Sequence, residues 1–394
     1  MMKRTEYRMF HAILTVSLLA GSFLLAKPMP IVGRVELVET VNTLPEVHLA
    51  NNRLELTFLP DSMGRISQIR HRAKQKELLQ PYIQKILHGN PLFAPSTSNI
   101  CGIREMFWGI KMTGSDIPVR LVRQSENQIE FDSLHYGNTA FGLQRKVHLV
   151  PDSMLLEFSL KLRNNSSAAA TYSLWFNLTP VLPIHTMLPI KGGAQPVRGR
   201  GLQKLADEDT LFAGKQGQYF YAPAAPWAAA RLESVGLLMV ICFDMKELQP
   251  DGFFYSWGGI TSSGEMRTFE PIFGSRELAP GDVCEHQYRI LFLPEMEALR
   301  GMIGNTGINA SFSNTELQLE FAAPVATAGQ SVAVNLKNAT ETISLGNIRI
   351  PDLVPEKTEK LSLRLPNSIA TGRYRVQLST DAETIELIGA VLER

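Results

Sequence analysis

Glu270 is the acidic residue whose neighbours raise the first question of chemistry in this 394-residue chain. It lies among Phe269, Pro271 and Ile272, where a charge is costly unless a hydrogen-bond donor meets it. A carboxyl group in such surroundings has two interpretations. It is either half of a structural salt bridge or a catalytic group.

Tryptophan side chains offer a second kind of chemistry, because their flat faces suit the apolar C–H faces of sugar rings. All four tryptophans of the chain lie before residue 305. Three of them, Trp108, Trp175 and Trp257, are candidates for stacking on a sugar, although core packing is the commoner role of any one tryptophan. One of the three in a cleft would favour a carbohydrate ligand.

His185 lies in the proline-bounded segment PVLPIHTMLP and is either an ordinary loop histidine or an acid. The three cysteines, Cys101, Cys242 and Cys284, are too few and odd in number for a full disulfide framework, although one bridge could form. The chain has no CxxC, no HExxH and no Cys and His cluster at metal-ligand spacing. We therefore expect no metal and no other cofactor.

The elements that must position these residues are strands. Apolar and polar residues alternate in RLELTFL (53–59) and MLLEFSLKLR (154–163), which is typical of half-buried strands. Turn residues such as Pro60-Asp61 and Asn164-Asn165 separate such runs at short intervals. The pattern predicts an all-β protein of antiparallel sheets packed face to face, with one short helix near 295–303.

The composition changes near residue 305. Short alternating runs follow, among them Leu317/Leu319/Phe321 and Tyr374/Val376/Leu378. This segment resembles an immunoglobulin-like or fibronectin-like module, so we expect residues 306–394 to form a small β-sandwich that folds alone. Residues 40–304 then form a separate, larger domain.

The N-terminus is typical of an exported protein. Lys3, Arg4 and Arg8 precede an apolar run over 12–26, which matches the basic and apolar regions of a secretory signal peptide. The run is shorter than the roughly 20 residues of a membrane-spanning helix. We expect residues 1–26 to be a signal peptide, a periplasmic or secreted mature chain, and no stable membrane span after cleavage.

Charge excludes one class of partner. The chain carries 39 basic and 38 acidic residues, for a formal net charge of +1. Such a balance provides no long-range field that gathers polyanions, so we expect no nucleic-acid partner.

Several segments of the larger domain resemble galactose mutarotase-like domains, the aldose epimerase superfamily. The segment HLANNRLELTFLPDSMGRISQI (48–69) is similar to their first hairpin, with Gly64 and then Arg65 in the turn. The segment FEPIFGSRELAPGDVCEHQYRILF (269–292) is similar to their end, and YSLWFNLTP (172–180) and GFFYSWGG (252–259) lie between in the expected order. The resemblance implies a β-supersandwich over this domain.

The resemblance also implies site residues. Aldose epimerases use a Glu as base and a His as acid, with a second His and an Arg on sugar hydroxyls. The Glu corresponds to Glu270 and the Arg to Arg104, and Arg65 joins the substrate-binding candidates. The two histidine positions correspond to Cys101 and to the neighbourhood of Trp175, so both are replaced. His185 lies ten residues beyond Trp175, and a shifted loop could bring it back.

Three hypotheses follow. The first is a carbohydrate-binding protein on a mutarotase-like scaffold that lacks the histidine acid. The second is a sugar-active enzyme, an epimerase-like isomerase or a lyase, that uses Glu270 as base with His185. The third is a structural protein of the cell envelope with a vestigial cleft. Loss of both histidines favours the first hypothesis, because neither a thiol nor an indole replaces an imidazole near neutral pH.

Overall fold

The computed structural model describes residues 45–80, 102–110, 118–136, 139–197, 201–206, 208–214, 219–261 and 264–393. Regular structure in these ranges is β apart from short 3-10 turns such as η1 (Pro60–Ser62) and η4 (Met245–Leu248), which confirms the predicted all-β class. None of the helices in these ranges is long and apolar enough to cross a membrane. The expected signal peptide, 1–26, lies outside the described residues.

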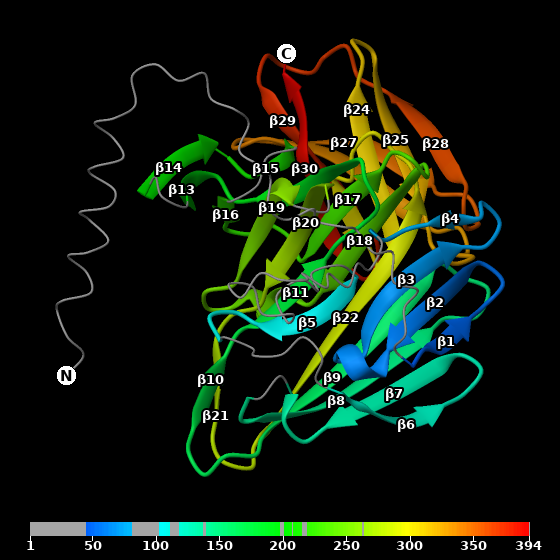
Figure 1. Ribbon diagram of the computed structural model, residues 1–394. Coiled ribbons are helices and arrows are strands. Elements are labelled where there is room, and N and C mark those ends of the chain that lie inside the picture. Colours follow the sequence, from blue (N-terminus) through cyan, green and yellow to red (C-terminus); the bar gives the residue numbers. More distant parts are fainter. Residues whose placement is uncertain are drawn as a thin grey trace, which may run out of the picture.

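Two sheets face each other in the first part of the chain (Figure 1). The first, here called the large sheet, has eleven strands within the described residues. They are β1 (Val47–Ala50), β2 (Leu54–Leu59), β3 (Arg65–His71), β4 (Lys76–Glu77), β5 (Ile103–Phe107), β11 (Leu174–Leu178), β20 (Gly264–Ile272), β19 (Phe253–Thr261), β16 (Tyr219–Tyr221), β13 (Gly193–Val197) and β14 (Gly201–Ala206).

The second sheet, here called the nine-stranded sheet, packs against the first. Its strands in spatial order are β15 (Thr210–Gly214), β12 (Ile184–Ile190), β17 (Trp227–Leu232), β18 (Leu237–Phe243), β22 (Val283–Pro294), β9 (Leu155–Asn164), β8 (Phe141–Leu149), β7 (Gln128–Ser133) and β6 (Arg120–Gln124). A separate hairpin pairs β10 (Ala170–Tyr172) with β21 (Arg276–Leu278).

Alternation along the strands builds the core between the two sheets. In β9, Leu156, Phe158, Leu160 and Leu162 point into this core, while the intervening Glu157, Ser159 and Lys161 point away. The predicted strand pattern of this segment is therefore confirmed, because period-two alternation gives each strand one apolar face.

One charged pair lies inside this core. The Glu105 carboxylate accepts a hydrogen bond of 3.0 Å from Nε of Arg145, and both side chains are almost fully buried. The Tyr288 hydroxyl also donates to Glu105, and Arg145 donates to the backbone carbonyl of Gly64. The pair therefore ties the large sheet, through β5, to β8 and β22 of the nine-stranded sheet.

The C-terminal part forms its own two-sheet sandwich (yellow to red in Figure 1). One sheet has the order β23 (Gly301–Ile303), β24 (Thr306–Phe312), β25 (Glu316–Ala322) and β28 (Thr358–Arg364). The other has the order β27 (Thr342–Arg349), β26 (Ser331–Lys337), β29 (Arg373–Ser379) and β30 (Thr384–Glu393). A separate apolar core fills the space between these sheets and begins at Ile303.

The segment before this sandwich corrects one prediction. No helix forms near 295–303: residues 295–300 are irregular, and Gly301–Ile303 form strand β23 against β24. Met296 and Leu299 are buried against both parts of the chain, in a cluster that also holds Trp227 and Ala322. Tertiary burial of these apolar residues outweighs their local helical pattern.

Strand β23 changes the segment that we expect to fold alone. Residues 301–394 should unfold in one cooperative thermal transition, because they contain both sheets and their core. Residues 306–394 lack β23 and the buried Ile303, whose loss costs about 1–2 kcal/mol. Their melting temperature should therefore be lower by roughly 5–10 °C. Calorimetry of both segments checks this, and a non-cooperative transition of 301–394 would contradict it.

Candidate functional site

A row of polar side chains crosses the middle of the large sheet on four adjacent strands (β5, β11, β20 and β19 in Figure 1). Arg104 on β5 lies opposite Asn177 on β11, and Glu270 on β20 lies opposite Tyr255 on β19. The register between β11 and β20 sets Asn177 against Glu270. Directly opposed residues share a face, so the four side chains form one row.

The row lies on the face of the large sheet that is turned away from the inter-sheet core. The strand neighbours of its members, such as Ile103, Phe176, Phe269 and Phe254, all belong to that core. Because successive side chains of a strand alternate, the row points in the opposite direction.

Glu270 is the centre of the row and is 2% exposed. Its carboxyl group accepts hydrogen bonds from the Trp175 indole (Nε1 to Oε2, 2.6 Å) and the Asn177 amide (Nδ2 to Oε1, 3.1 Å). Burial raises the pKa of Glu270 to about 7, although the neighbouring Thr268 hydroxyl, the Trp175 indole N–H and the Arg104 charge act to lower it. The group can therefore take up or release a proton near neutral pH.

Aromatic rings form a wall beside Glu270. Trp108 follows β5 and makes edge contacts with Trp175 and Phe253, at centroid distances of 5.3 and 5.4 Å, and a tilted contact with Tyr255 at 5.8 Å. Trp108, Trp175 and Phe253 are half-buried rather than core residues. Rings that remain partly accessible next to hydrogen-bonding groups are suited to the mixed polar and apolar surface of a sugar.

Arg65 extends the row at its other end. Ile66 on β3 pairs with Ile103 on β5, and both side chains enter the inter-sheet core. The preceding Arg65 is therefore on the same face as Arg104, and it is 0% exposed. The turn before it contains Gly64 with φ of +64°, where a Cβ atom would come within 2.9 Å of Val119. Gly64 permits this turn, and the strand that follows it sets Arg65 beside Arg104 on the adjacent strand β5.

Arg104 and the adjacent Glu105 act in different places. The two residues are consecutive in β5, so their side chains leave opposite faces of the large sheet. Glu105 bonds Arg145 inside the core, whereas Arg104 acts on Glu270 as a nearby positive charge.

His185 is not brought to Glu270. It lies on β12, where Ile184 and Leu188 enter the inter-sheet core, so His185 leaves the nine-stranded sheet on its outer face. Glu270 leaves the large sheet on the opposite side of the sandwich. The Nε2 atom of His185 contacts a carboxylate oxygen of Glu233 instead. The prediction that His185 is the acid partner of Glu270 is therefore wrong. Trp175 belongs to the large sheet, but His185, ten residues later, belongs to the nine-stranded sheet.

Two other predicted positions have no described side chain. Trp257 belongs to β19, but its side chain lies outside the described residues, and so does Cys101. Within the described part of the chain, the hydrogen bonds to Glu270 come from Trp175 and Asn177, and none comes from a histidine. No group of three or more His, Cys, Asp or Glu residues in that part could hold a metal ion.

Sequence reasoning missed Asn177, Phe253 and Tyr255. Asn177 lies two residues after Trp175 on one strand, so strand alternation alone could have placed it on the same face. Phe253 and Tyr255 stand in the aromatic segment 252–259, in the same alternation. Alternation alone does not show that these residues lie next to Glu270. That requires knowing that β11 and β19 both pair with β20.

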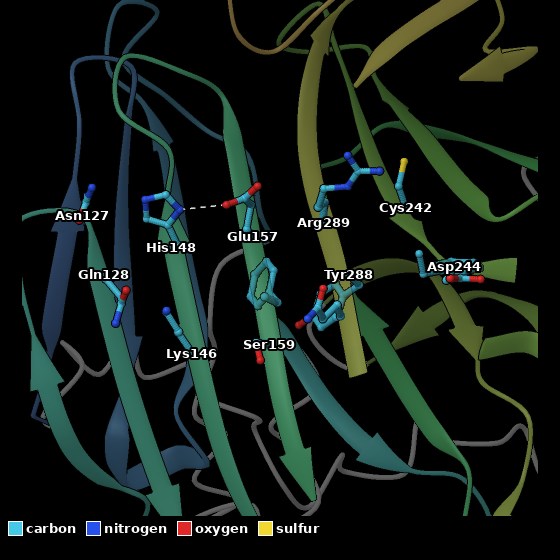
Figure 2. Close-up of a pocket in the computed structure, with 13 residues that line it drawn as sticks. Asn127, Gln128, Lys146, His148, Glu157, Ser159, Cys242, Asp244, Tyr288 and Arg289 are labelled. Atoms are coloured by element: carbon cyan, nitrogen blue, oxygen red, sulfur yellow. Dashed lines mark hydrogen bonds and ion pairs between the residues drawn. The ribbon is translucent and has the colours of Figure 1, made fainter. Parts of the chain in front are cut away.

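A separate hollow lies on the outer face of the nine-stranded sheet (Figure 2). This groove of about 770 Å³ is lined by charged and amide side chains of β7, β8, β9 and β22. Two of its charged side chains already have partners: His148 Nδ1 is 2.9 Å from Glu157 Oε2, and Arg289 donates to Asn305 outside the groove. We place the candidate site at Glu270 instead. Its carboxyl group is buried, burial raises its pKa, and half-buried aromatic rings lie beside it.

Several similar solved structures are described as mutarotases or aldose epimerases. A galactose mutarotase related enzyme from Lactobacillus acidophilus is 12% identical, covers 64% of this chain and 99% of its own, and has a TM-score of 0.47. A putative aldose 1-epimerase from Escherichia coli K12 is 12% identical over 63% of this chain and 98% of its own, with a TM-score of 0.45. A putative mutarotase from Salmonella typhimurium is 9% identical over 72% and 100%, also with 0.45. No family model and no curated protein matches the chain.

Proposed function

We propose that this chain is an exported carbohydrate-binding protein whose site is the row centred on Glu270, with the tryptophan wall beside it. The observation that carries the proposal is the convergence of Arg104, Asn177 and Glu270 on one face, next to half-buried Trp108 and Trp175. The basic and apolar N-terminal segment supports export to a periplasm or beyond.

The chemistry of the row matches the surface of a sugar. A hydroxyl group both donates and accepts, so it can donate to the Glu270 carboxylate and accept from an Arg104 or Asn177 N–H group. A ring face with axial C–H groups packs on an indole. Mutarotation needs an acid as well as a base. Among the described residues the hydrogen bonds to Glu270 come from Trp175 and Asn177, and no histidine is there to act as the acid.

Binding should depend on both Arg104 and Glu270. We expect Glu270→Gln and Arg104→Ala each to weaken binding of the best glycan about tenfold or more. Removing one partner of a buried hydrogen bond costs about 1–3 kcal/mol, which corresponds to such a factor. Titration calorimetry against a panel of neutral mono- and oligosaccharides measures the effect.

The matched control is Glu157→Gln, which makes the same chemical change on the far side of the sandwich, in the groove of Figure 2. This variant should bind as the unmodified chain does. Equal losses in Glu157→Gln and Glu270→Gln would contradict a site at the large sheet. Binding lost in Glu157→Gln alone would move the site to the groove.

The alternative is an isomerase or lyase that uses Glu270 as its base. One observation favours it: a buried carboxyl with a pKa of about 7 suits general base catalysis near neutral pH. Anomer exchange followed by NMR distinguishes the two functions. We expect exchange no faster than in buffer, whereas fast exchange that disappears in Glu270→Gln would establish the enzyme.

A further inference from the structure

A second cluster of reactive side chains lies where strand β22 begins, next to the β10–β21 hairpin. This end of β22 is far from the C-terminal sandwich (Figure 1). Tyr172 of β10, Glu247 of η4, Arg276 of β21, and Cys284 and His286 of β22 meet there. None of the five belongs to the row around Glu270, and the proposed carbohydrate site does not use them.

His286 is the centre of this cluster and is 1% exposed. Its Nδ1 atom is 2.9 Å from Oε2 of Glu247, and its Nε2 atom is 2.7 Å from the Tyr172 hydroxyl. Arg276 donates to the same Glu247 oxygen at 3.0 Å. The imidazole is therefore held on both nitrogens, and an acid orients it in the way that nucleophile-activating histidines are oriented.

Cys284 is a partly exposed member of the cluster. It lies two residues before His286 on the same strand, so the two side chains share a face. It is half-buried between exposed Val283 and Glu285, and the neighbouring His286 and Tyr172 act to lower the pKa of its thiol. A small molecule in solution can therefore reach the sulfur, while its proton-accepting partners are inside the protein.

The charges along the cluster alternate. Arg276 and His286 flank the Glu247 carboxylate, and they hold its pKa below the ordinary value although burial acts to raise it. Contacts with Cys284 and Glu247 raise the pKa of His286 against the opposing effect of burial. The hydrogen bond with His286 lowers the pKa of Cys284. The arrangement as a whole favours a thiolate next to an imidazolium.

We propose that Cys284 is a reactive-thiol site, activated by His286 and Glu247, that forms mixed disulfides with small disulfide molecules. The Cys284 proton passes to His286 Nε2, directly or through the Tyr172 hydroxyl. The thiolate attacks one sulfur of the small disulfide, a new S–S bond forms, and the other sulfur leaves as a thiolate. The small disulfide is the oxidant, so electrons balance without another reagent.

If the cluster has only a structural role, the expected reactivity of Cys284 is different. If His286 only fills a polar gap in the core, Cys284 reacts like a thiol on an unfolded chain, with a pKa near 8.5. The chain supplies an internal reference in Cys242, which is 4% exposed and whose pKa burial raises to about 12. Cys242 should stay unreactive while the protein is folded.

The test is the reaction of the full-length protein with 5,5′-dithiobis(2-nitrobenzoate) between pH 5 and 9, with the labelled residue identified by mass spectrometry. We expect Cys284 to react first, about tenfold faster at pH 6.5 than a thiol of the urea-unfolded chain. Its rate should level off below pH 8.5. Cys284→Ser should remove this phase.

Two variants test the activating groups. Glu247→Gln removes the negative charge behind His286, and Tyr172→Phe removes the hydroxyl but keeps the ring. Each should lower the Cys284 rate at pH 6.5 about tenfold and move its pH profile upward by about one unit. A Cys284 rate equal to that of the unfolded chain would overturn the proposal. So would unchanged profiles in whichever of the two variants folds.

Discussion

Replacing Glu105 by leucine is expected to destabilise the chain by about 3–5 kcal/mol. The substitution leaves the Arg145 guanidinium inside the inter-sheet core without its anion, and an uncompensated buried charge is among the most costly defects of a fold. It also removes the acceptor of the Tyr288 hydroxyl. Denaturant unfolding followed by tryptophan fluorescence measures the change in the unfolding midpoint.

The double variant Glu105→Leu/Arg145→Met separates the charge from the contacts. It should recover much of the loss, because no unpaired charge remains and apolar side chains fill similar space. Glu285→Gln, an acid in an exposed ion pair with Lys161, should change stability by less than about 1 kcal/mol. A loss below 1 kcal/mol in Glu105→Leu would mean that the pair does not join the two sheets energetically.

The contribution of Glu270 to the stability of the folded chain should fall as pH rises from about 4.5 to 7. Its pKa is about 7 when folded and 4.5 ordinarily, so the folded state keeps a proton that the unfolded state releases. The contribution is complete below pH 4.5 and is lost as pH rises through 7. The difference between the two pKa values corresponds to about 3 kcal/mol.

Glu270→Gln isolates this effect from all other titrating groups. The amide cannot ionise, so the stability difference between the unmodified chain and the variant should change by about 3 kcal/mol between pH 4.5 and 8. Urea unfolding of both proteins at intervals of one pH unit gives the two curves. Parallel curves would show that Glu270 titrates alike in the folded and unfolded states.

Much of the fold was predictable because strand patterns are local. Leu156, Phe158, Leu160 and Leu162 alternate with polar residues, and alternation alone places them on a buried face. The change of composition near residue 305 likewise predicted a separate C-terminal sandwich, whose first strand begins at Gly301. The helix expected near 295–303 was wrong, because burial of Met296 and Leu299 between two parts of the chain is not visible in local periodicity.

The candidate site was predictable only in its members. A carboxyl among apolar residues indicated Glu270, and the resemblance to mutarotase-like domains indicated Arg104 and the position of Trp175. Their convergence depends on β5, β11 and β20 lying side by side although they are distant in sequence. The strand order and the face on which each side chain lies also separate His185 from Glu270. The same two factors pair Glu105 with Arg145.

The sequence by itself determined residue type, strand alternation and the apolar surroundings of Glu270, because these properties depend on neighbours along the chain. Tertiary structure decided which strands pair and in which register, and hence which side chains meet. A shift of one residue between β11 and β20 would turn Asn177 and Trp175 into the core and leave Glu270 without donors. The register depends on how much apolar surface all strands of both sheets bury together. It therefore cannot be predicted from any one segment of the sequence.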